Sequence, residues 1–158
     1  MRTLSRLLVG LFSVLFLAGF STVPASAAET ARAETSVTIQ ALCHPCNGFR
    51  YQNPGSKAVY VVIDGLRHYV PDPTTYFNLW GGWDGLRPDG STITIGDSLI
   101  HGAFLAKEVE TGKVYLVGRT KRWIPSPTVF NQYAFDPSKI RSMSRASLPA
   151  AGPNIPGR

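Results

Sequence analysis

Reactive side chains are scarce in this sequence. It has three histidines and two cysteines in 158 residues, and charged residues make up only 16%. It contains no P-loop, dinucleotide-binding fingerprint, zinc-ligand spacing or G-x-S-x-G element. A hydrolase needs its nucleophile, base and acid at one locus, whereas Asp84, Asp89 and Asp97 lie in glycine-rich connections that turn formation explains. We therefore predict no enzyme, no cofactor and no metal site.

Strong charge of one sign is also missing. The 16 Lys and Arg residues exceed the 10 Asp and Glu residues only modestly, for a net charge of +6. The positive charges are scattered, and Arg119, Lys121 and Arg122 form the one local cluster. Nucleic-acid binders usually carry a dense basic stripe and a recognisable motif. We predict no nucleic-acid partner, which leaves weak attraction to acidic partners or anionic wall polymers open.

The one long apolar run lies at residues 7–20, close to the N-terminus. It follows Arg2 and Arg6, and the small-x-small pattern of Ala25-Ser26-Ala27 comes after it. This order is typical of a signal peptide over 1–27, cleaved after Ala27. The run is short for a bilayer span of about 20 residues, which disfavours the alternative of a retained anchor. We predict a secreted, extracellular protein with no membrane span.

The only two cysteines, Cys43 and Cys46, stand three positions apart. Outside the cytosol, paired thiols are normally oxidised, so we predict a disulfide that closes a tight loop. A thioredoxin-like C-x-x-C belongs to a βαβ setting, which this sequence does not show. A zinc site needs more ligands than this segment offers.

The segment between the signal peptide and the remaining chain, 28–56, reads as an N-terminal extension. Residues 28–34 are small and polar, which favours disorder. Residues 35–42 alternate, with Val37 and Ile39 on one face, and predict a β-strand. That strand either pairs with its own sheet or lies across a partner by strand addition. At the other end, 149–158 is rich in Pro and Gly and predicts a mobile tail.

An internal repeat organises the remainder. VYVV at 59–62 matches VYLV at 114–117, an offset of 55 (114 − 59). RHYVPDPT at 67–74 matches KRWIPSPT at 121–128, an offset of 54 (121 − 67), and Tyr76 then matches Phe130. One residue is missing between the blocks, and a turn absorbs such a loss without flipping side chains. We predict one domain over 57–148, with repeat 1 at 57–108 and repeat 2 at 113–148.

Each repeat predicts a β-hairpin followed by a short helix. Asp64-Gly65 favours a type I′ turn, which pairs Val59 with Val70. The second copy uses a three-residue loop, 118–120, and pairs Tyr115 with Trp123. In each Pro-x-Pro corner, the middle residue is a good N-cap and the second proline suits the first helical position, which predicts helices over 73–79 and 127–133. The fold class is therefore mainly β: two tandem hairpin-plus-helix repeats in one small domain, preceded by an N-terminal strand.

Aromatic and basic residues of these repeats are the candidate binding groups. Exposed Tyr and Trp give rigid contact area at low entropy cost. The alternatives are that the rings form the core of a thin module and that the arginines are solvated strand ends. The predicted partner-binding residues are Val37, Ile39, Arg67, Tyr69, Trp80, Trp83, Arg122 and Trp123.

The pattern Val-Tyr-x-Val, a turn, a basic residue and Pro-x-Pro-Thr, at 59–76 and 114–130, resembles a tandem repeat of secreted actinobacterial proteins. Small proteins of this design are similar to the adaptor subunit of umbrella toxin particles. That resemblance implies a protein that joins a lectin-bearing subunit to a toxin stalk through an N-terminal strap and a globular part.

We therefore predict a secreted, non-enzymatic adaptor that bridges partner proteins, within an extracellular antibacterial toxin complex. Two alternatives stay open. One is a cell-wall or carbohydrate-binding module that uses Trp80, Trp83 and the hairpin aromatics. The other is a secreted hydrolase inhibitor whose N-terminal strap occupies a cleft.

Overall fold

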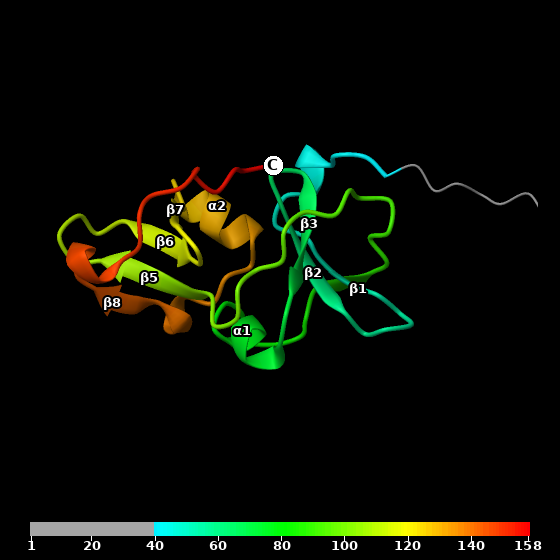
Figure 1. The fold of residues 1–158 in the computed structure, drawn as a ribbon, viewed down its shortest axis with the longest axis horizontal. Coiled ribbons are helices and arrows are strands. Elements are labelled where there is room, and N and C mark those ends of the chain that lie inside the picture. The colour runs from blue at the N-terminus through cyan, green and yellow to red at the C-terminus, as the bar shows by residue number, and fades with distance from the viewer. Residues whose placement is uncertain (1–39) are drawn as a thin grey trace, which may run out of the picture. The chain divides into compact units, whose positions relative to one another are not determined.

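The computed structural model of the chain describes residues 40–158 (Figure 1). The predicted signal peptide, and Val37 and Ile39 of the predicted strand, lie outside the described residues. Of the strand expected over 35–42, the described part forms one isolated parallel bridge, from Ala41 to Ile93. Within 40–158 no helix has both the length and the apolar character that crossing a membrane requires.

The described part of the chain, 40–158, contains two four-stranded sheets, one for each repeat, which confirms the mainly β class. The first has the order β3-β2-β1-β4 and the second the order β7-β6-β5-β8. In both, a three-stranded antiparallel meander is joined by a parallel fourth strand. The strands are β1 Arg50–Gln52, β2 Val59–Ile63, β3 Leu66–Val70, β4 Leu86–Pro88, β5 Phe104–Glu108, β6 Val114–Val117, β7 Lys121–Trp123 and β8 Arg141–Met143.

The two hairpins have the predicted registers. Val59 pairs with Val70 in the first, and Tyr115 pairs with Trp123 in the second. Asp64 and Gly65 have φ angles of 56° and 74°, as both central positions of a type I′ turn require. The second copy is one residue shorter, and the missing residue falls in the loop 118–120 between β6 and β7. The side chains of both strands therefore keep the same faces as in the first copy.

A short helix follows each hairpin, α1 Pro73–Phe77 and α2 Pro127–Gln132. The side chains of Asp72 and Ser126 accept the predicted capping hydrogen bonds, from the amides of Thr75 and Val129. Both helices end earlier than predicted, α1 by two residues and α2 by one. In α1 the reason is a tightened last turn, in which the amides of Leu79 and Trp80 both donate to the carbonyl of Tyr76.

The sheets divide the chain differently from the predicted repeat boundaries. Each structural repeat starts with an additional strand, β1 at 50–52 and β5 at 104–108, ahead of the hairpin. Through their pairing with β2 and β6, Arg50 occupies the position of Leu105 and Tyr51 that of Ala106. The residues at these equivalent positions are of different types. The internal repeat in the sequence therefore does not extend to β1 and β5.

One hydrophobic core is shared by the two repeats. Trp80 and Tyr133, which follow α1 and α2, are 1% and 0% exposed. The Trp80 indole donates to the Tyr133 carbonyl over 2.9 Å and stacks on Phe135, with ring centroids 5.9 Å apart. This core contains Val59, Val61, Ile63, Val70, Tyr76, Leu79, Trp80, Leu105, Leu116, Ile124, Tyr133, Phe135 and Ile155.

The C-terminal segment packs on this core, in contrast to the mobile tail predicted over 149–158. Ile155 is 1% exposed, and its amide donates to the carbonyl of Trp123 over 2.8 Å. Figure 1 shows the segment passing α2 on its way to the first repeat. The prediction weighed Pro and Gly content and gave too little weight to one apolar residue that fills a core position.

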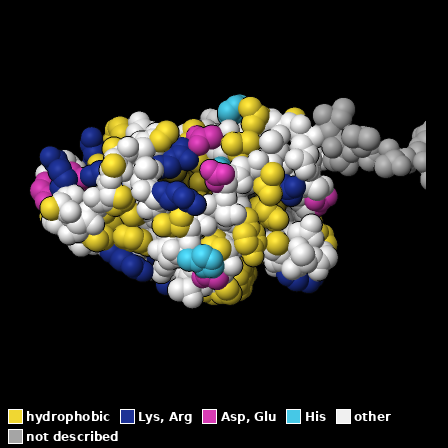
Figure 2. Space-filling model, in the orientation of Figure 1, with side chains coloured by type: hydrophobic (Ala, Val, Ile, Leu, Met, Phe, Trp, Pro, Cys, Tyr) yellow, Lys and Arg dark blue, Asp and Glu magenta, His cyan; other side chains and the backbone are white. Residues whose placement is uncertain are grey.

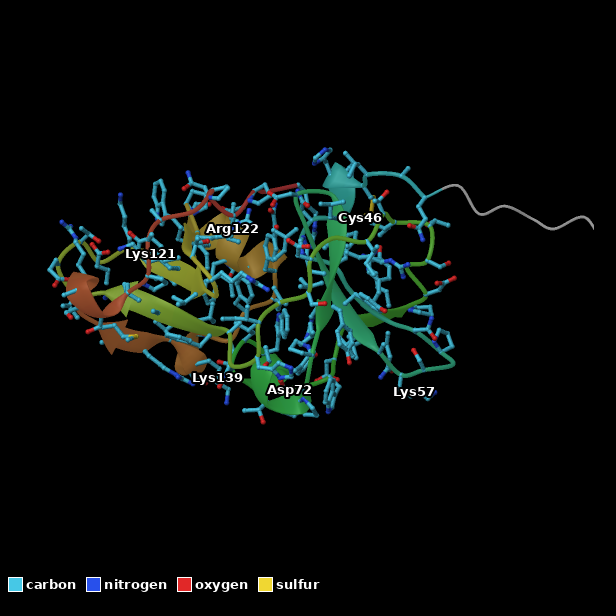
Figure 3. The ribbon with its side chains drawn as sticks, viewed as in Figure 1. Cys46, Lys57, Asp72, Lys121, Arg122 and Lys139 are labelled. Carbon is cyan, nitrogen blue, oxygen red and sulfur yellow. A yellow bond between two sulfur atoms is a disulfide. The ribbon has the colours of Figure 1, made fainter. Side chains whose placement is uncertain are left out.

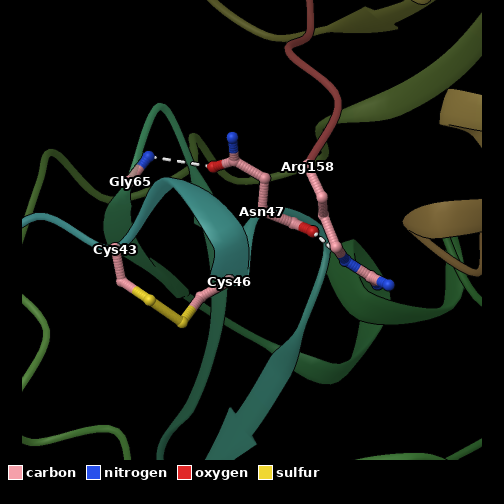
Figure 4. Close-up of a disulfide and its surroundings, with 5 residues drawn as sticks. All are labelled: Cys43, Cys46, Asn47, Gly65 and Arg158. Atoms are coloured by element: carbon pink, nitrogen blue, oxygen red, sulfur yellow. Dashed lines mark hydrogen bonds between the residues drawn. A yellow bond between two sulfur atoms is a disulfide. The ribbon is translucent and has the colours of Figure 1, made fainter.

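Three further 3-10 turns, η1 His44–Cys46, η2 Pro137–Lys139 and η3 Arg145–Ser147, complete the described elements. η1 lies inside the predicted Cys43–Cys46 disulfide, which is present (Figure 4). The Cys43 amide donates to the carbonyl of Gly65 over 2.9 Å, so the disulfide loop covers the turn of the first hairpin.

Asn47 connects this loop to the turn of the first hairpin and to the C-terminus. It is 1% exposed, and its side chain accepts from the Gly65 amide and donates to the Gly157 carbonyl, both over 2.9 Å. Its own carbonyl accepts from the Arg158 guanidinium over 2.7 Å (Figure 4). The carbonyl oxygen and the amino group of this buried side chain therefore both have a hydrogen-bond partner, as a buried amide needs.

A buried carboxylate forms ion pairs with two basic residues of the second repeat. Glu108, whose side chain is 2% exposed, accepts from Lys121 over 2.7 Å and from Arg145 over 3.1 Å. The hydrogen bond from Lys121 is the main cause that lowers the pKa of Glu108 to about 2, with further bonds from Arg145 and Thr111. A carboxyl whose folded pKa is depressed stabilises the fold above its unfolded pKa, and that stability is lost as the pH falls.

We therefore expect the protein to lose stability as the pH falls from about 4.5 towards 2, and Glu108→Gln to flatten that part of the profile. Denaturation in urea at several pH values measures it. The matched control is Glu110→Gln, which changes an exposed acid of the same turn. Equal slopes for Glu108→Gln and the unmodified chain would contradict the role of Glu108.

Candidate functional site

Each repeat contains a hollow at the corner where its hairpin, its Pro-x-Pro segment and the first turn of its helix meet. The corner pocket of the first repeat has a volume of about 320 Å³ and that of the second about 400 Å³. The first is lined by Ser56, Lys57, Ala58, Val59, Tyr69, Val70, Pro71, Asp72, Pro73, Tyr76 and Trp83. The second is lined by Thr111, Gly112, Lys113, Val114, Trp123, Ile124, Pro125, Ser126, Pro127, Phe130 and Ile140.

The two corner pockets are built from equivalent positions. Ten of the eleven residues that line each one correspond under the offsets of 55 and 54 that relate the repeats. The cause is local: the hairpin register brings the start of its first strand against the end of its second, and the prolines direct the chain away from the sheet. The residues that define the sequence repeat therefore also line the pockets.

Aromatic rings form one wall of the first pocket. The Trp83 ring stacks on the Tyr76 ring, with centroids 4.0 Å apart and planes 23° apart. Phe77 packs edge-on against Trp83 at 5.1 Å. Trp83 is 45% exposed and Phe77 38% exposed, whereas Tyr76 is buried. One face of the Trp83 ring is thus covered within the chain and the remainder is available for contact.

Arg50 of β1 holds this aromatic wall in place. Its guanidinium donates to the Tyr76 hydroxyl and to the carbonyls of Gly82 and Asp84. It also lies over the Trp80 ring, 5.2 Å from the centroid. Arg50 is 6% exposed, and these oxygen atoms and ring faces stabilise its buried charge. It fixes the loop that carries Trp83.

The second pocket has a different character. Its aromatic wall consists of Trp123 and Phe130, with Ile140 in place of the tryptophan loop. The Lys113 ammonium lies 4.6 Å from the centroid of the Trp123 ring, which places a cation at the rim. Ser126 stands where the first pocket has Asp72, so the second pocket lacks the carboxylate of the first.

Asp72 is the one acidic residue that lines the first pocket, and it lies at the start of α1 (Figure 3). The Thr75 amide is the main cause that lowers the pKa of Asp72, and the Thr75 hydroxyl and His101 add to it. His101 contacts the carboxylate over 2.7 Å but is itself 82% exposed. The Thr75 hydroxyl donates to the carboxylate, not to the imidazole, and Thr75 is fully buried. The three groups form a helix cap, and their order is not that of a nucleophile, base and acid.

Three of the predicted partner-binding residues line the corner pockets: Tyr69 and Trp83 in the first and Trp123 in the second. Trp80 does not. The sequence left open whether it packs in the core or contacts a partner, and it packs in the core. Trp83, two glycines later, is half exposed and lines the first pocket.

The two predicted arginines lie outside both pockets. Arg122 is engaged within the chain: it contacts Asp64 over 2.9 Å and donates to the carbonyls of Pro153 and Asn154 (Figure 3). Arg67 lies over the Tyr60 ring, 5.0 Å from the centroid. On the face shown in Figure 2, Lys and Arg side chains are scattered and do not form a stripe.

Residues that the sequence did not single out complete the site. Tyr76 marked the repeat but was not named as a binding residue, although its ring carries Trp83. Phe77 has no aromatic counterpart in the second repeat, where Asn131 follows Phe130. Arg50 gave no signal, because the strand that contains it is not visible as part of the repeat. The pairing of Tyr76 with Phe130 was the one clue available.

No known family model, curated protein or solved structure matches this chain. Among residues 40–158 there is also no group of three or more His, Cys, Asp or Glu side chains placed to hold a metal ion. The chemistry of the corner pockets is therefore the basis for assigning a function.

Proposed function

We propose that the protein is a secreted, non-enzymatic adaptor that bridges partner proteins through its two corner pockets. The observation that carries this proposal is the repetition of the pocket at equivalent positions of both repeats. A single chain with two such sites binds two protein segments at once, and tethering raises the effective concentration of the second partner.

The walls of the pockets suit apolar side chains of a partner. Volumes of about 320 and 400 Å³ lie at the lower end for ligand pockets, which run from about 300 to 1,000 Å³. Rigid, partly exposed Tyr and Trp side chains lose little entropy on binding and are enriched at protein interfaces. Each pocket therefore accepts an anchoring side chain of a partner segment.

The two pockets differ in charge, which favours two different partners over two copies of one. The first pocket carries the carboxylate of Asp72 and the ammonium of Lys57. The second carries Lys113 and no carboxylate. Charge complementarity selects partners more than it strengthens binding, so a segment with an acidic residue beside its anchor prefers the second pocket.

Secretion and the toxin complex are part of the same proposal. The N-terminal sequence has the regions of a signal peptide, and a disulfide such as Cys43–Cys46 persists in oxidising compartments. The resemblance of the repeats to an adaptor of umbrella toxin particles implies a lectin-bearing subunit and a toxin stalk as the partners. The inhibitor alternative depends on residues that lie outside the described part.

Carbohydrate binding is the second candidate, and one observation favours it. The Trp83 ring offers an exposed, rigid surface in the pocket that also contains Asp72, and sugar sites need an apolar surface with a few polar groups. Co-sedimentation with purified cell wall that depends on Trp83, without recovery of protein partners, would favour this function over the adaptor.

The adaptor function predicts that Trp83→Ala and Trp123→Ala each weaken a different partner by roughly tenfold or more, since aromatic anchors contribute about 2 kcal/mol or more. The mature chain, tagged at its C-terminus, is used to recover partners from culture medium. Each recovered partner is then purified and titrated against the variants by calorimetry.

Val109→Ala is the matched control, because Val109 is 59% exposed and lines neither pocket. It should bind both partners normally. Undiminished affinity of every partner for the double variant Trp83→Ala/Trp123→Ala would reject the corner pockets as the binding sites.

A further inference from the structure

The sheet of the first repeat extends beyond β3 by two short segments. Arg67 of β3 forms a parallel bridge with Ile95: its amide donates to the Thr94 carbonyl, and its carbonyl accepts from the Gly96 amide, both over 3.0 Å. Ala41 then covers the outer edge, since it donates to the Thr92 carbonyl and accepts from the Thr94 amide, also over 3.0 Å.

The second repeat reproduces the first of these two segments. Lys121, at the position of Arg67, forms a parallel bridge with Ala151. Its amide donates to the Ala150 carbonyl over 2.9 Å, and its carbonyl accepts from the Gly152 amide over 3.0 Å. Ala150, Ala151 and Gly152 therefore stand at the positions of Thr94, Ile95 and Gly96.

The second covering segment has no counterpart in the second repeat among the residues that the structure describes. The groups that correspond to the Thr92 carbonyl and the Thr94 amide are the Leu148 carbonyl and the Ala150 amide. Neither has a hydrogen-bond partner among residues 40–158. Ala150 is exposed and Leu148 half-buried. Unpaired donors and acceptors at a sheet edge form a template for another strand.

The chain has no described segment left for this edge. Ala41 precedes β1 by nine residues (50 − 41), and Ile95 and Gly96 precede β5 by nine and eight (104 − 95, 104 − 96). In the second repeat the equivalent of the Ala41 segment is thus the segment 95–96. That segment is already paired with Arg67 in the first sheet.

From these contacts we propose that the edge at 148–150 is a strand-addition site for an extended segment of a partner protein. The added strand runs parallel to 148–150, donates one amide to the Leu148 carbonyl and accepts from the Ala150 amide. Its central residue is small, as Ala41 is on the equivalent edge. Pro149 does not block it, because the equivalent Ile93 directs its amide inward, to the Gly90 carbonyl. The proposal names the kind of partner segment that the adaptor function requires and rests on that function.

A synthetic peptide of residues 36–42, which contains Ala41, is the probe for this site. Added to the mature chain at about 5 mM, a peptide with a Kd of about 1 mM slows hydrogen exchange of the Ala150 amide about sixfold, since protection equals 1 + [L]/Kd. The peptide with an N-methyl group on the Ala41 nitrogen cannot donate to the Leu148 carbonyl and should give no protection. Absence of protection by the unmodified peptide, or equal protection by both, overturns the site.

Protein variants give the second arm. Ala150→Pro removes the amide and should abolish peptide binding, which is followed in this variant by the NMR signal of the Ala151 amide. Ala151→Ser keeps the backbone and should bind normally. Sedimentation that shows copies of the mature chain associating through this edge would overturn a separate partner as the occupant. The peptide readout needs neither corner pocket, so its failure is distinguishable from failure of the adaptor function, which Trp83→Ala and Trp123→Ala test.

Discussion

Trp80→Ala is expected to lower the free energy of unfolding by about 3–5 kcal/mol. The indole is 1% exposed and lies between the two repeats, stacked on Phe135 and hydrogen-bonded to the Tyr133 carbonyl. Its loss leaves a large cavity and a buried carbonyl without its donor, two separate costs. Small domains are stable by only about 5–15 kcal/mol, so this change removes a large share of the total.

Equilibrium denaturation in urea measures the effect, and Trp83→Ala is the matched control. Trp83 has the same side chain three residues later but is 45% exposed. It loses mainly its stacking on Tyr76, so about 1 kcal/mol is expected. Similar costs for the two variants would show that Trp80 does not join the repeats. Two separate unfolding transitions in the unmodified chain would show the same.

The sequence predicted the repeat elements that depend on local chemistry. The type I′ turn at Asp64-Gly65 and the helix caps at Asp72 and Ser126 follow from neighbouring residues, and all three are present. The offsets of 55 and 54 also place Tyr69 and Trp123 at the same position of two hairpins, and those two residues line the two pockets.

What the sequence did not predict depends on contacts between distant segments. Ile155 fills a core position more than 30 residues after the strand whose carbonyl it contacts, at Trp123. A run of Pro and Gly around a single isoleucine has no periodicity from which burial can be inferred. The strands β1 and β5 are three and five residues long and share no residue type at their equivalent positions, so only their pairing identifies them.

The division of Trp80 and Trp83 between core and pocket has the same origin. Two tryptophans that flank a pair of glycines are equivalent in the sequence. Their roles separate because a buried cation, Arg50, lies over the ring of the first and holds the carbonyls of the loop that carries the second. Nothing near those tryptophans in the sequence indicates that a residue 30 positions earlier sets their exposure.

Arg50→Leu is expected to disable the first pocket and leave the second intact. Leucine is the residue at the equivalent position of the second repeat, Leu105, so the substitution suits a buried strand. It leaves the Asp84 carbonyl without its donor and the Gly82 carbonyl with only the Tyr76 hydroxyl, which donates to it over 2.8 Å. Loss of charged hydrogen bonds at a buried site costs about 2–4 kcal/mol. The loop of Trp83 is then held to Tyr76 only by the hydroxyl bond to Gly82 and by ring stacking, and it is less well fixed.

The three tryptophans of the chain allow a direct readout, because each gives one indole N–H signal in a nitrogen-edited NMR spectrum. Arg50→Leu should move the signals of Trp80 and Trp83 and leave that of Trp123 in place. The partner of the first pocket should lose roughly tenfold or more in affinity, as with Trp83→Ala, and the partner of the second should be unaffected. Leu105→Ala is the control: it destabilises by a similar amount, about 2–5 kcal/mol, without touching the Trp83 loop.

Comparing the affinity of the first partner for Arg50→Leu and for Leu105→Ala separates an effect on stability from an effect on the pocket. If Leu105→Ala weakens the first partner as much as Arg50→Leu does, the loss follows from general destabilisation and Arg50 has no special part in the pocket. If only Arg50→Leu weakens it, a single difference in β1 has given one of two equivalent corners a stacked tryptophan that the other lacks. In a tandem repeat whose pockets share ten positions, such a change outside the repeated motif is a physical route by which two copies of one site acquire two partners.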